Sequence, residues 1–189
     1  MEAATEMTTE QLEFMEIMIA SDINNDALLL EKAGKHEEAE VKYLEALRMK
    51  EQCSRATALG VALTQNALGE LYMKMGRLDE AYELLQKAYQ ARRVINSFDK
   101  TCTADNLGRL FEMKGDPVKA AEWRTVNGPN RLICSYFDCP KSQKCYFSKL
   151  NDLKKCAKCK CVFYCDRTCQ TVDWQRHKPY CKVLSKAAE

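Results

Sequence analysis

The sequence lacks any apolar run long enough to cross a bilayer. Its best apolar segment, Phe14–Ala20, is short and contains Glu16, whereas a membrane-spanning helix needs about 20 apolar residues. The N-terminal residues are acidic and have no apolar core of the kind that a secretion signal requires. We therefore expect an intracellular protein, cytoplasmic or nuclear, in a reducing compartment where disulfides are disfavoured.

Cysteine is scarce in the first 130 residues, where only Cys53 and Cys102 occur; the other nine cysteines lie between Cys134 and Cys181. Such a concentration in a chain without a secretion signal indicates metal binding. The net charge changes sign at the same place. Residues 1–130 have 16 basic and 22 acidic residues, a net charge of −6, and residues 131–189 have 13 basic and 5 acidic residues, a net charge of +8. The turn-rich segment 126–133 is the expected linker between two domains.

Small residues recur at a fixed spacing in the first part of the chain. Offsets of five, nine and twelve residues from a glycine give two complete copies, Gly34, Ala39, Tyr43 and Ala46, and then Gly76, Ala81, Leu85 and Ala88. A third copy has Gly115 and Ala120 but loses the pattern at Arg124. We interpret each copy as a helix–turn–helix unit, in which the glycine ends one helix with a positive φ and the alanines lie where paired helices approach.

Local signals predict further details of these helices. Asp116 followed by Pro117 is typical of an N-cap and first helical residue, and Thr8 with Gln11 fits a capping box. Gly69 and Gly108 occupy matching leucine–glycine runs, where we expect neighbouring helices to approach closely.

These segments resemble tetratricopeptide repeats, although their period of 42 and then 39 residues is longer, as in kinesin light chains. The resemblance implies a mostly α fold, with an extra N-terminal helix over 1–19 and about three antiparallel helix pairs over 20–125. In such repeats, asparagines near the positions of Asn66 and Asn106 often bond a peptide backbone. The array is therefore either a peptide-binding surface or a spacer that presents the C-terminal domain.

The C-terminal segment contains four pairs of metal-binding residue types, each pair close in sequence. They are Cys134 and Cys139, Cys156 and Cys159, Cys165 and Cys169, and His177 and Cys181. Eight ligands form two tetrahedral sites, and thiolates with one imidazole favour zinc. Because four protein ligands leave no open position for a substrate water, we predict two structural Zn²⁺ ions.

The ligand order, with histidine seventh, resembles the MYND zinc finger, as do the steps Tyr164–Cys165, Cys169–Gln170 and Asp173–Trp174. The resemblance covers 134–181 and leaves 182–189 as a C-terminal tail. It implies that one ion is bound by Cys134, Cys139, Cys165 and Cys169, and the other by Cys156, Cys159, His177 and Cys181. The gap within the first pair is wider than is usual in the family, so Cys145 remains an alternative to Cys139.

The MYND resemblance also implies a peptide-binding face. Residues at the positions of Gln170 and Trp174 grip short proline-containing peptides in that family. Of the two aromatics before Cys165, one is expected beneath the zinc and the other, assigned here as Tyr164, at the edge of the groove. Trp174 has an alternative role as the largest core side chain of a small domain.

The function that these features predict is an interaction adaptor with protein or peptide partners. The sequence shows no nucleophile–base pair or phosphate loop, so we expect no enzyme activity. One alternative is a fragment or accessory of the lysine methyltransferases that combine a MYND finger with tetratricopeptide-like helices, because no residues remain for their catalytic domain. Another is a nucleic-acid-associated regulator. It rests on a basic cluster formed by Lys154, Lys155, Lys158 and Lys160, which is not accompanied by a groove-reading helix or stacked aromatics.

Overall fold

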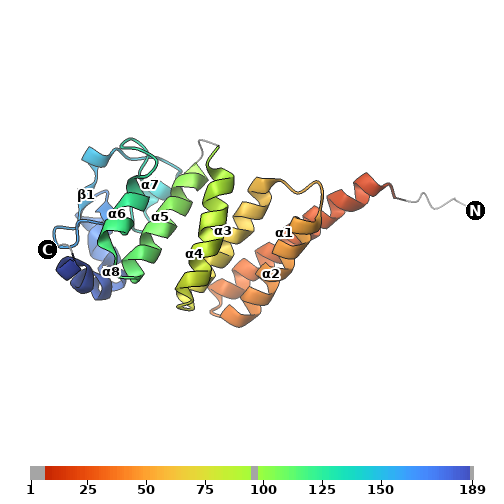
Figure 1. The fold of residues 1–189 in the computed structure, drawn as a ribbon, viewed down its shortest axis with the longest axis horizontal. Coiled ribbons are helices and arrows are strands. Elements are labelled where there is room, and N and C mark those ends of the chain that lie inside the picture. The colour runs from red at the N-terminus through yellow and green to blue at the C-terminus, as the bar shows by residue number, and fades with distance from the viewer. Residues whose placement is uncertain (1–6, 95–97, 188–189) are drawn as a thin grey trace, which may run out of the picture. The chain divides into compact units, whose positions relative to one another are not determined.

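The computed structural model describes residues 7–94 and 98–187 (Figure 1). The chain divides into two compact units, Met1–Ala91 and Arg92–Glu189. Most of the described residues are helical, and the one sheet found among them has two short strands. The predicted fold class, mostly α with a helix-pair array before a small finger, is confirmed.

The first unit is built from helices α1 (Thr9–Lys32), α2 (His36–Gln52), α3 (Ala58–Lys74) and α4 (Leu78–Arg92). Gly34 and Gly76 join α1 to α2 and α3 to α4, each with φ of +77°, the left-handed conformation that glycine adopts readily. At the start of α1, the Thr8 side chain accepts a hydrogen bond from the Gln11 backbone, and the Gln11 side chain accepts one from the Thr8 backbone. The predicted glycine turns and capping box are therefore present.

One helix, α1, spans the boundary at residue 19 at which a separate N-terminal helix was expected to end. The segment Thr9–Lys32 contains neither glycine nor proline, so nothing in the local sequence interrupts its hydrogen-bond ladder. The residues expected to form an extra helix are thus the first turns of the helix that pairs with α2.

The pairing of α3 with α4 depends on a close approach at Gly69. A Cβ at this position would lie 2.8 Å from Cγ of Leu85 and 3.4 Å from the carbonyl oxygen of Ala81. Both neighbours belong to the repeated positions of α4, and both are fully buried. The sequence interpretation of Gly69 as a contact point between paired helices agrees with this geometry.

The second unit begins with α5 (Phe98–Met113) and α6 (Pro117–Thr125), joined through Gly115 at φ of +80°. Asp116 accepts a hydrogen bond from the Lys119 backbone and caps α6, as its sequence predicts. The finger region follows, with α7 (Pro140–Gln143), a 3₁₀ turn (Leu150–Asp152), strands β1 (Lys154–Lys155) and β2 (Phe163–Tyr164), and α8 (Arg167–Ala187). The strands pair antiparallel, and Leu132, Leu153 and Phe163 form a small core beside them.

The expected linker at 126–133 lies inside the second unit, because α5 and α6 both contact α8. Helix α8 also continues past Cys181, so residues 182–187, expected as part of a tail, are helical. Leu184 is fully buried, and Cγ1 of Val183 would lie 3.4 Å from a Cβ at Gly115. Packing against the turn between α5 and α6 therefore accounts for the extra helical turn.

None of the helices in the described residues combines the length and apolar character that a membrane span requires.

Candidate metal centre

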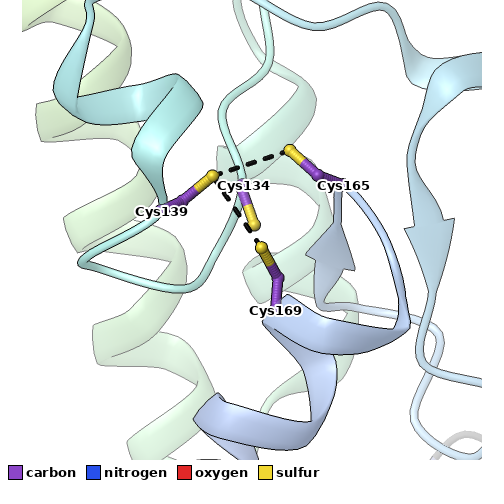
Figure 2. Close-up of side chains that lie close together, drawn as sticks. All are labelled: Cys134, Cys139, Cys165 and Cys169. Atoms are coloured by element: carbon purple, nitrogen blue, oxygen red, sulfur yellow. Dashed lines mark hydrogen bonds between the residues drawn. The ribbon is translucent and has the colours of Figure 1, made fainter.

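Four cysteines from separate segments of the second unit converge in the first group (Figure 2). Their Sγ atoms all lie within 4.8 Å of one another, and the group contains Cys134, Cys139, Cys165 and Cys169. Sγ of Cys139 lies 3.6 Å from Sγ of Cys165 and 3.9 Å from Sγ of Cys169. A tetrahedral zinc with Zn–S bonds of about 2.3 Å places its sulfurs about 3.8 Å apart, whereas a disulfide needs about 2.05 Å. The spacing fits a metal ion and not a disulfide.

The local folds around these cysteines explain their convergence. Cys139 directly precedes α7, Cys165 directly follows β2, and Cys169 lies in the first turn of α8. Burial raises the pKa of the Cys169 thiol to about 12 and that of Cys134 further still. In the absence of an ion these thiols are therefore protonated at neutral pH, and metal binding must displace their protons.

The second group contains one imidazole and three thiols, all buried: Cys156, Cys159, His177 and Cys181. Sγ of Cys156 lies 3.7 Å from Sγ of Cys181, and Sγ of Cys159 lies 3.5 Å from Nε2 of His177. A tetrahedral zinc with Zn–S of about 2.3 Å and Zn–N of about 2.05 Å gives a sulfur–nitrogen separation of about 3.6 Å. The donor set and its spacing thus fit Zn²⁺ here as well.

Helix and turn geometry position these four ligands. His177 and Cys181 are four residues apart on α8 and share one face. Cys156 follows β1, and its carbonyl accepts a hydrogen bond from the Lys160 backbone across a tight turn. Lys160 ends this turn with φ of +57°. The turn places the Cys159 side chain close to that of Cys156.

Two further cysteines of the finger region belong to neither group. Cys145 is exposed and adopts φ of +57° just after α7. Cys161 is buried, and its carbonyl oxygen accepts a hydrogen bond from Arg124. The structure places Cys139, and not Cys145, beside Cys134.

The histidine of the second group has a carboxylate partner outside the finger. Nδ1 of His177 lies 2.6 Å from Oε1 of Glu112 on α5, and both side chains are fully buried. Nη2 of Arg124 donates to Oε2 of Glu112 at 2.7 Å, and Nη1 of Arg176 donates to Oε1 at 3.1 Å. Burial acts to raise the pKa of the Glu112 carboxyl, but Arg124, the His177 contact and Arg176 together hold it well below its usual range. Glu112 is therefore ionised at neutral pH.

The ionic network extends from the helix pair into the finger. Arg124, which is 4% exposed, also donates to Oδ1 of Asp105 at 3.1 Å and to the carbonyl oxygen of Cys161 at 2.8 Å. Arg176 donates two hydrogen bonds to Asp173, and the Tyr164 hydroxyl donates to the same carboxylate at 2.8 Å. Each of these buried or half-buried charges thus has an oppositely charged partner.

The sequence interpretation missed this network, although one signal pointed to it. Arg124 lies nine residues after Gly115, at the repeat position held by the buried residues Tyr43 and Leu85. A charged residue at a core position of a repeat requires a buried partner. The third repeat departs from the pattern at Arg124 because this position holds a charged residue that bonds Glu112 and Asp105, in place of an uncharged core residue.

Comparison with known proteins agrees with the two sequence resemblances. A family model described as MYND finger matches residues 137–181, and one described as Tetratricopeptide repeat matches residues 60–123. The chain therefore contains tetratricopeptide repeats followed by a MYND finger. Both of these modules mediate protein–protein interactions.

Similar proteins include methyltransferases that are much longer than the matched segments. A SET and MYND domain-containing protein of Dictyostelium discoideum is 54% identical over 75 residues, which are 38% of this chain and 13% of that protein. N-lysine methyltransferase SMYD2 of Rattus norvegicus is 47% identical over 41 residues, 22% of this chain and 10% of that protein. The matches therefore span only a small part of these relatives, and they cover the finger and repeat part and not a SET domain.

A solved structure resembles a larger share of the chain. The crystal structure of BtubC (BKLC) from P. vanneervenii aligns with a TM-score of 0.54 and 28% identity, covering 58% of this chain and 45% of that one.

The MYND finger presents two of the three residues expected to bind a peptide there. Trp174 is 36% exposed and Gln170 is half-buried, and both lie on α8 one turn apart. The Trp174 ring meets the His177 ring edge-on, with centroids 6.0 Å apart. Tyr164 is fully buried, so the expectation that it edges the surface does not fit its position. Its hydroxyl donates a hydrogen bond to Asp173 on α8, so the side chain connects β2 to that helix.

The two asparagines of the repeats differ in exposure. Asn66 on α3 is half-buried, and its Nδ2 donates to Glu70 at 2.6 Å. Asn106 on α5 is 6% exposed. A peptide on the surface of the repeats therefore has access to Asn66 more readily than to Asn106.

Proposed function

We propose that the protein is an interaction adaptor. Two structural zinc ions hold its MYND finger, the α8 face with Gln170 and Trp174 binds short proline-containing peptides, and the repeats present the finger or bind a second partner. The observation that carries the proposal is the position of Trp174. This large side chain is exposed on a helix that two metal groups and a buried ionic network fix in place.

Zinc is the ion that both groups fit. Each has four protein donors, seven thiols and one imidazole in all, with separations that match tetrahedral coordination. The groups would hold Zn²⁺ as a folding element, because four protein ligands leave no coordination position for a substrate. The proposal assigns the protein no catalytic activity of its own, and it places the protein in the cytoplasm or nucleus, where thiols stay reduced.

Extended peptides bind grooves lined by aromatic side chains through main-chain pairing and side-chain pockets. The exposed indole supplies a large apolar surface that a proline ring can cover. Gln170, one helical turn earlier, supplies an amide that can both donate and accept hydrogen bonds. Together they match an apolar, extended ligand better than a nucleic-acid backbone.

A second candidate function follows from the relatives. Their names describe SET and MYND domain proteins and N-lysine methyltransferases, so the chain is alternatively a non-catalytic fragment or accessory of such a methyltransferase system. In that case it should alter methylation by a SET-domain protein in a mixed assay. An adaptor of the first kind should leave that rate unchanged.

The test compares Trp174→Ala with Val172→Ala, which removes an exposed apolar side chain from another face of α8. Binding of a fluorescent proline-rich peptide is measured together with zinc content. We expect Trp174→Ala to abolish binding and to retain two zinc ions, and Val172→Ala to bind as the unchanged protein does. Loss of zinc in Trp174→Ala would show that the indole is a core residue.

A salt titration with the same peptide and with a DNA duplex separates the nucleic-acid alternative. Binding through phosphates weakens steeply, by about a thousandfold or more between 50 and 200 mM salt for six or more contacts. Peptide binding through Trp174 should change little over that range. Tight, salt-sensitive DNA binding without peptide binding would contradict the adaptor proposal.

A further inference from the structure

A histidine that binds a metal through one ring nitrogen usually donates a hydrogen bond from the other, most often to a carboxylate or a carbonyl. In the second metal group, Nε2 of His177 faces the thiols, and Nδ1 faces Glu112 at 2.6 Å. Arg124 and Arg176 both donate to the same carboxyl group, so its oxygens act as acceptors, and Nδ1 is placed to donate the third hydrogen bond. This tautomer leaves the lone pair of Nε2 directed toward the thiols.

The partner lies outside the finger itself. Glu112 belongs to α5, in the last helix pair of the repeats, whereas the MYND family match begins at residue 137. Two arginines hold the carboxylate: Arg124 of α6 donates to Oε2 and Arg176 of α8 donates to Oε1. All four side chains lie in one compact unit.

The repeat pattern shows that this arrangement uses an existing pair of positions. In the first repeat, Glu31 lies three residues before the turn glycine and Tyr43 lies nine residues after it. The Tyr43 hydroxyl donates a hydrogen bond to Glu31 at 2.9 Å. The third repeat has Glu112 and Arg124 at the same two positions, joined at 2.7 Å. In the first repeat the carboxylate also accepts a hydrogen bond from Lys74 of the next repeat, at 2.6 Å. In the third repeat it meets the finger.

We propose that Glu112 is a positioning residue of the second zinc site, so that the last helix pair is part of the finger's metal centre and not a spacer before it. Glu112 orients the His177 ring and fixes its tautomer. Arg124 and Arg176 hold Glu112 in place. The carbonyl of Cys161, which accepts from Arg124, ties the same network to the turn that contains Cys159.

The test is a double-mutant cycle in the full chain, with zinc affinity measured by chelator competition. Loss of a carboxylate that orients a metal-bound histidine typically weakens metal binding about 10- to 100-fold. We expect Glu112→Gln to weaken one of the two zinc sites by such a factor and to leave the four-cysteine site unchanged. Glu122→Gln, at an exposed position of α6, is the matched control and should leave both sites unchanged.

The cycle's second arm is His177→Cys, which replaces the imidazole with a thiolate that needs no oriented ring. In this background Glu112→Gln should change zinc affinity by less than about threefold, because no histidine ring remains for Glu112 to orient. Any effect of the substitution on the packing of Arg124 and Arg176 is still present in this background. An equal loss in both backgrounds would show that Glu112 acts only in packing, and no loss in either would also overturn the proposal. If the zinc-loaded Glu112→Gln protein lacks native far-UV circular dichroism, Glu112→Asp, which keeps the charge but is one methylene shorter, completes the same cycle with the same criteria.

Discussion

Nδ1 of His177 lies 2.6 Å from Oε1 of Glu112, although 65 positions separate the two residues. The contact joins α8 of the finger to α5 of the preceding helix pair. The carboxylate, the imidazole and the Arg124 guanidinium are buried, and Arg176 is half-buried. Removing the carboxylate would therefore leave the buried Arg124 without one of its two charged partners. The second unit, Arg92–Glu189, therefore has one shared ionic centre that crosses the border between repeat and finger.

The close approach of α5 and α6 at Gly108 should control zinc binding at a distance. A Cβ at this position would lie 2.6 Å from Cγ of Arg124 and 3.0 Å from the carbonyl oxygen of Ala120. Gly108→Ala should therefore displace Arg124 and destabilise the second unit, with an overpacking cost of about 1–3 kcal/mol against about 1 kcal/mol gained in helix propensity. We expect a lower melting temperature and weaker binding of one zinc ion, measured by thermal unfolding and chelator competition.

Gly69→Ala provides the comparison for that substitution, because its Cβ would crowd Leu85 and not an ionic residue. It should lower stability to a similar extent and leave zinc affinity unchanged. If both substitutions altered zinc binding equally, the effect would be a general one and the specific role of Arg124 would be refuted.

The choice between Cys139 and Cys145 can be tested by zinc counting. Cys139→Ser removes a thiol that lies 3.6 Å from Sγ of Cys165, so we expect one zinc ion per chain in place of two. Cys145→Ser changes an exposed thiol outside both groups and should retain two. The opposite result would transfer the ligand role to Cys145.

The buried Lys50 of α2 should make the stability of the first unit depend on pH. Lys50 is 5% exposed and donates to Oγ1 of Thr64, which itself donates to Asn24. Burial lowers the pKa of Lys50, so between that lowered value and the ordinary value of about 10.4 the unfolded chain binds more protons than the folded protein. The free energy of unfolding therefore rises with pH through this interval.

Lys50→Met removes the buried ammonium and should raise the free energy of unfolding at neutral pH, on the order of 1 kcal/mol. The difference from the unchanged protein should shrink as the pH approaches 10. Urea titrations at a series of pH values measure it, with Lys87→Met at an exposed site of α4 as the control. A difference that grew with rising pH would contradict the assignment.

Local sequence signals predicted much of the fold. The turns at Gly34, Gly76 and Gly115 each depend on one glycine with a positive φ. The start of α6 depends on two adjacent residues, Asp116 and Pro117. No residue near position 19 interrupts α1, so the helix continues through the boundary that was expected there. Contacts of α5 and α6 with α8 place residues 126–133 inside the second unit, and these contacts join residues far apart in the sequence.

The candidate site shows the same contrast. Paired spacing brought out the eight residues that form the two metal groups, because ligands within a pair are close in sequence. Glu112 had no such signal, since it is one of 22 acidic residues in the first part of the chain. The position of Arg124 at a core site of the repeat was the available indication. Tyr164 was assigned to the edge of the groove from the MYND resemblance, which does not indicate which of the two aromatic side chains is buried; the Tyr164 side chain is fully buried.

The most direct test of this account is the metal content of the reduced protein, residues 1–189. Elemental analysis combined with native mass spectrometry should give two zinc ions per chain, and their removal by a chelator should unfold the finger region, because zinc binding supplies on the order of 10 kcal/mol per structural site. A finger that keeps its native near-UV circular dichroism with no bound transition metal would contradict the account.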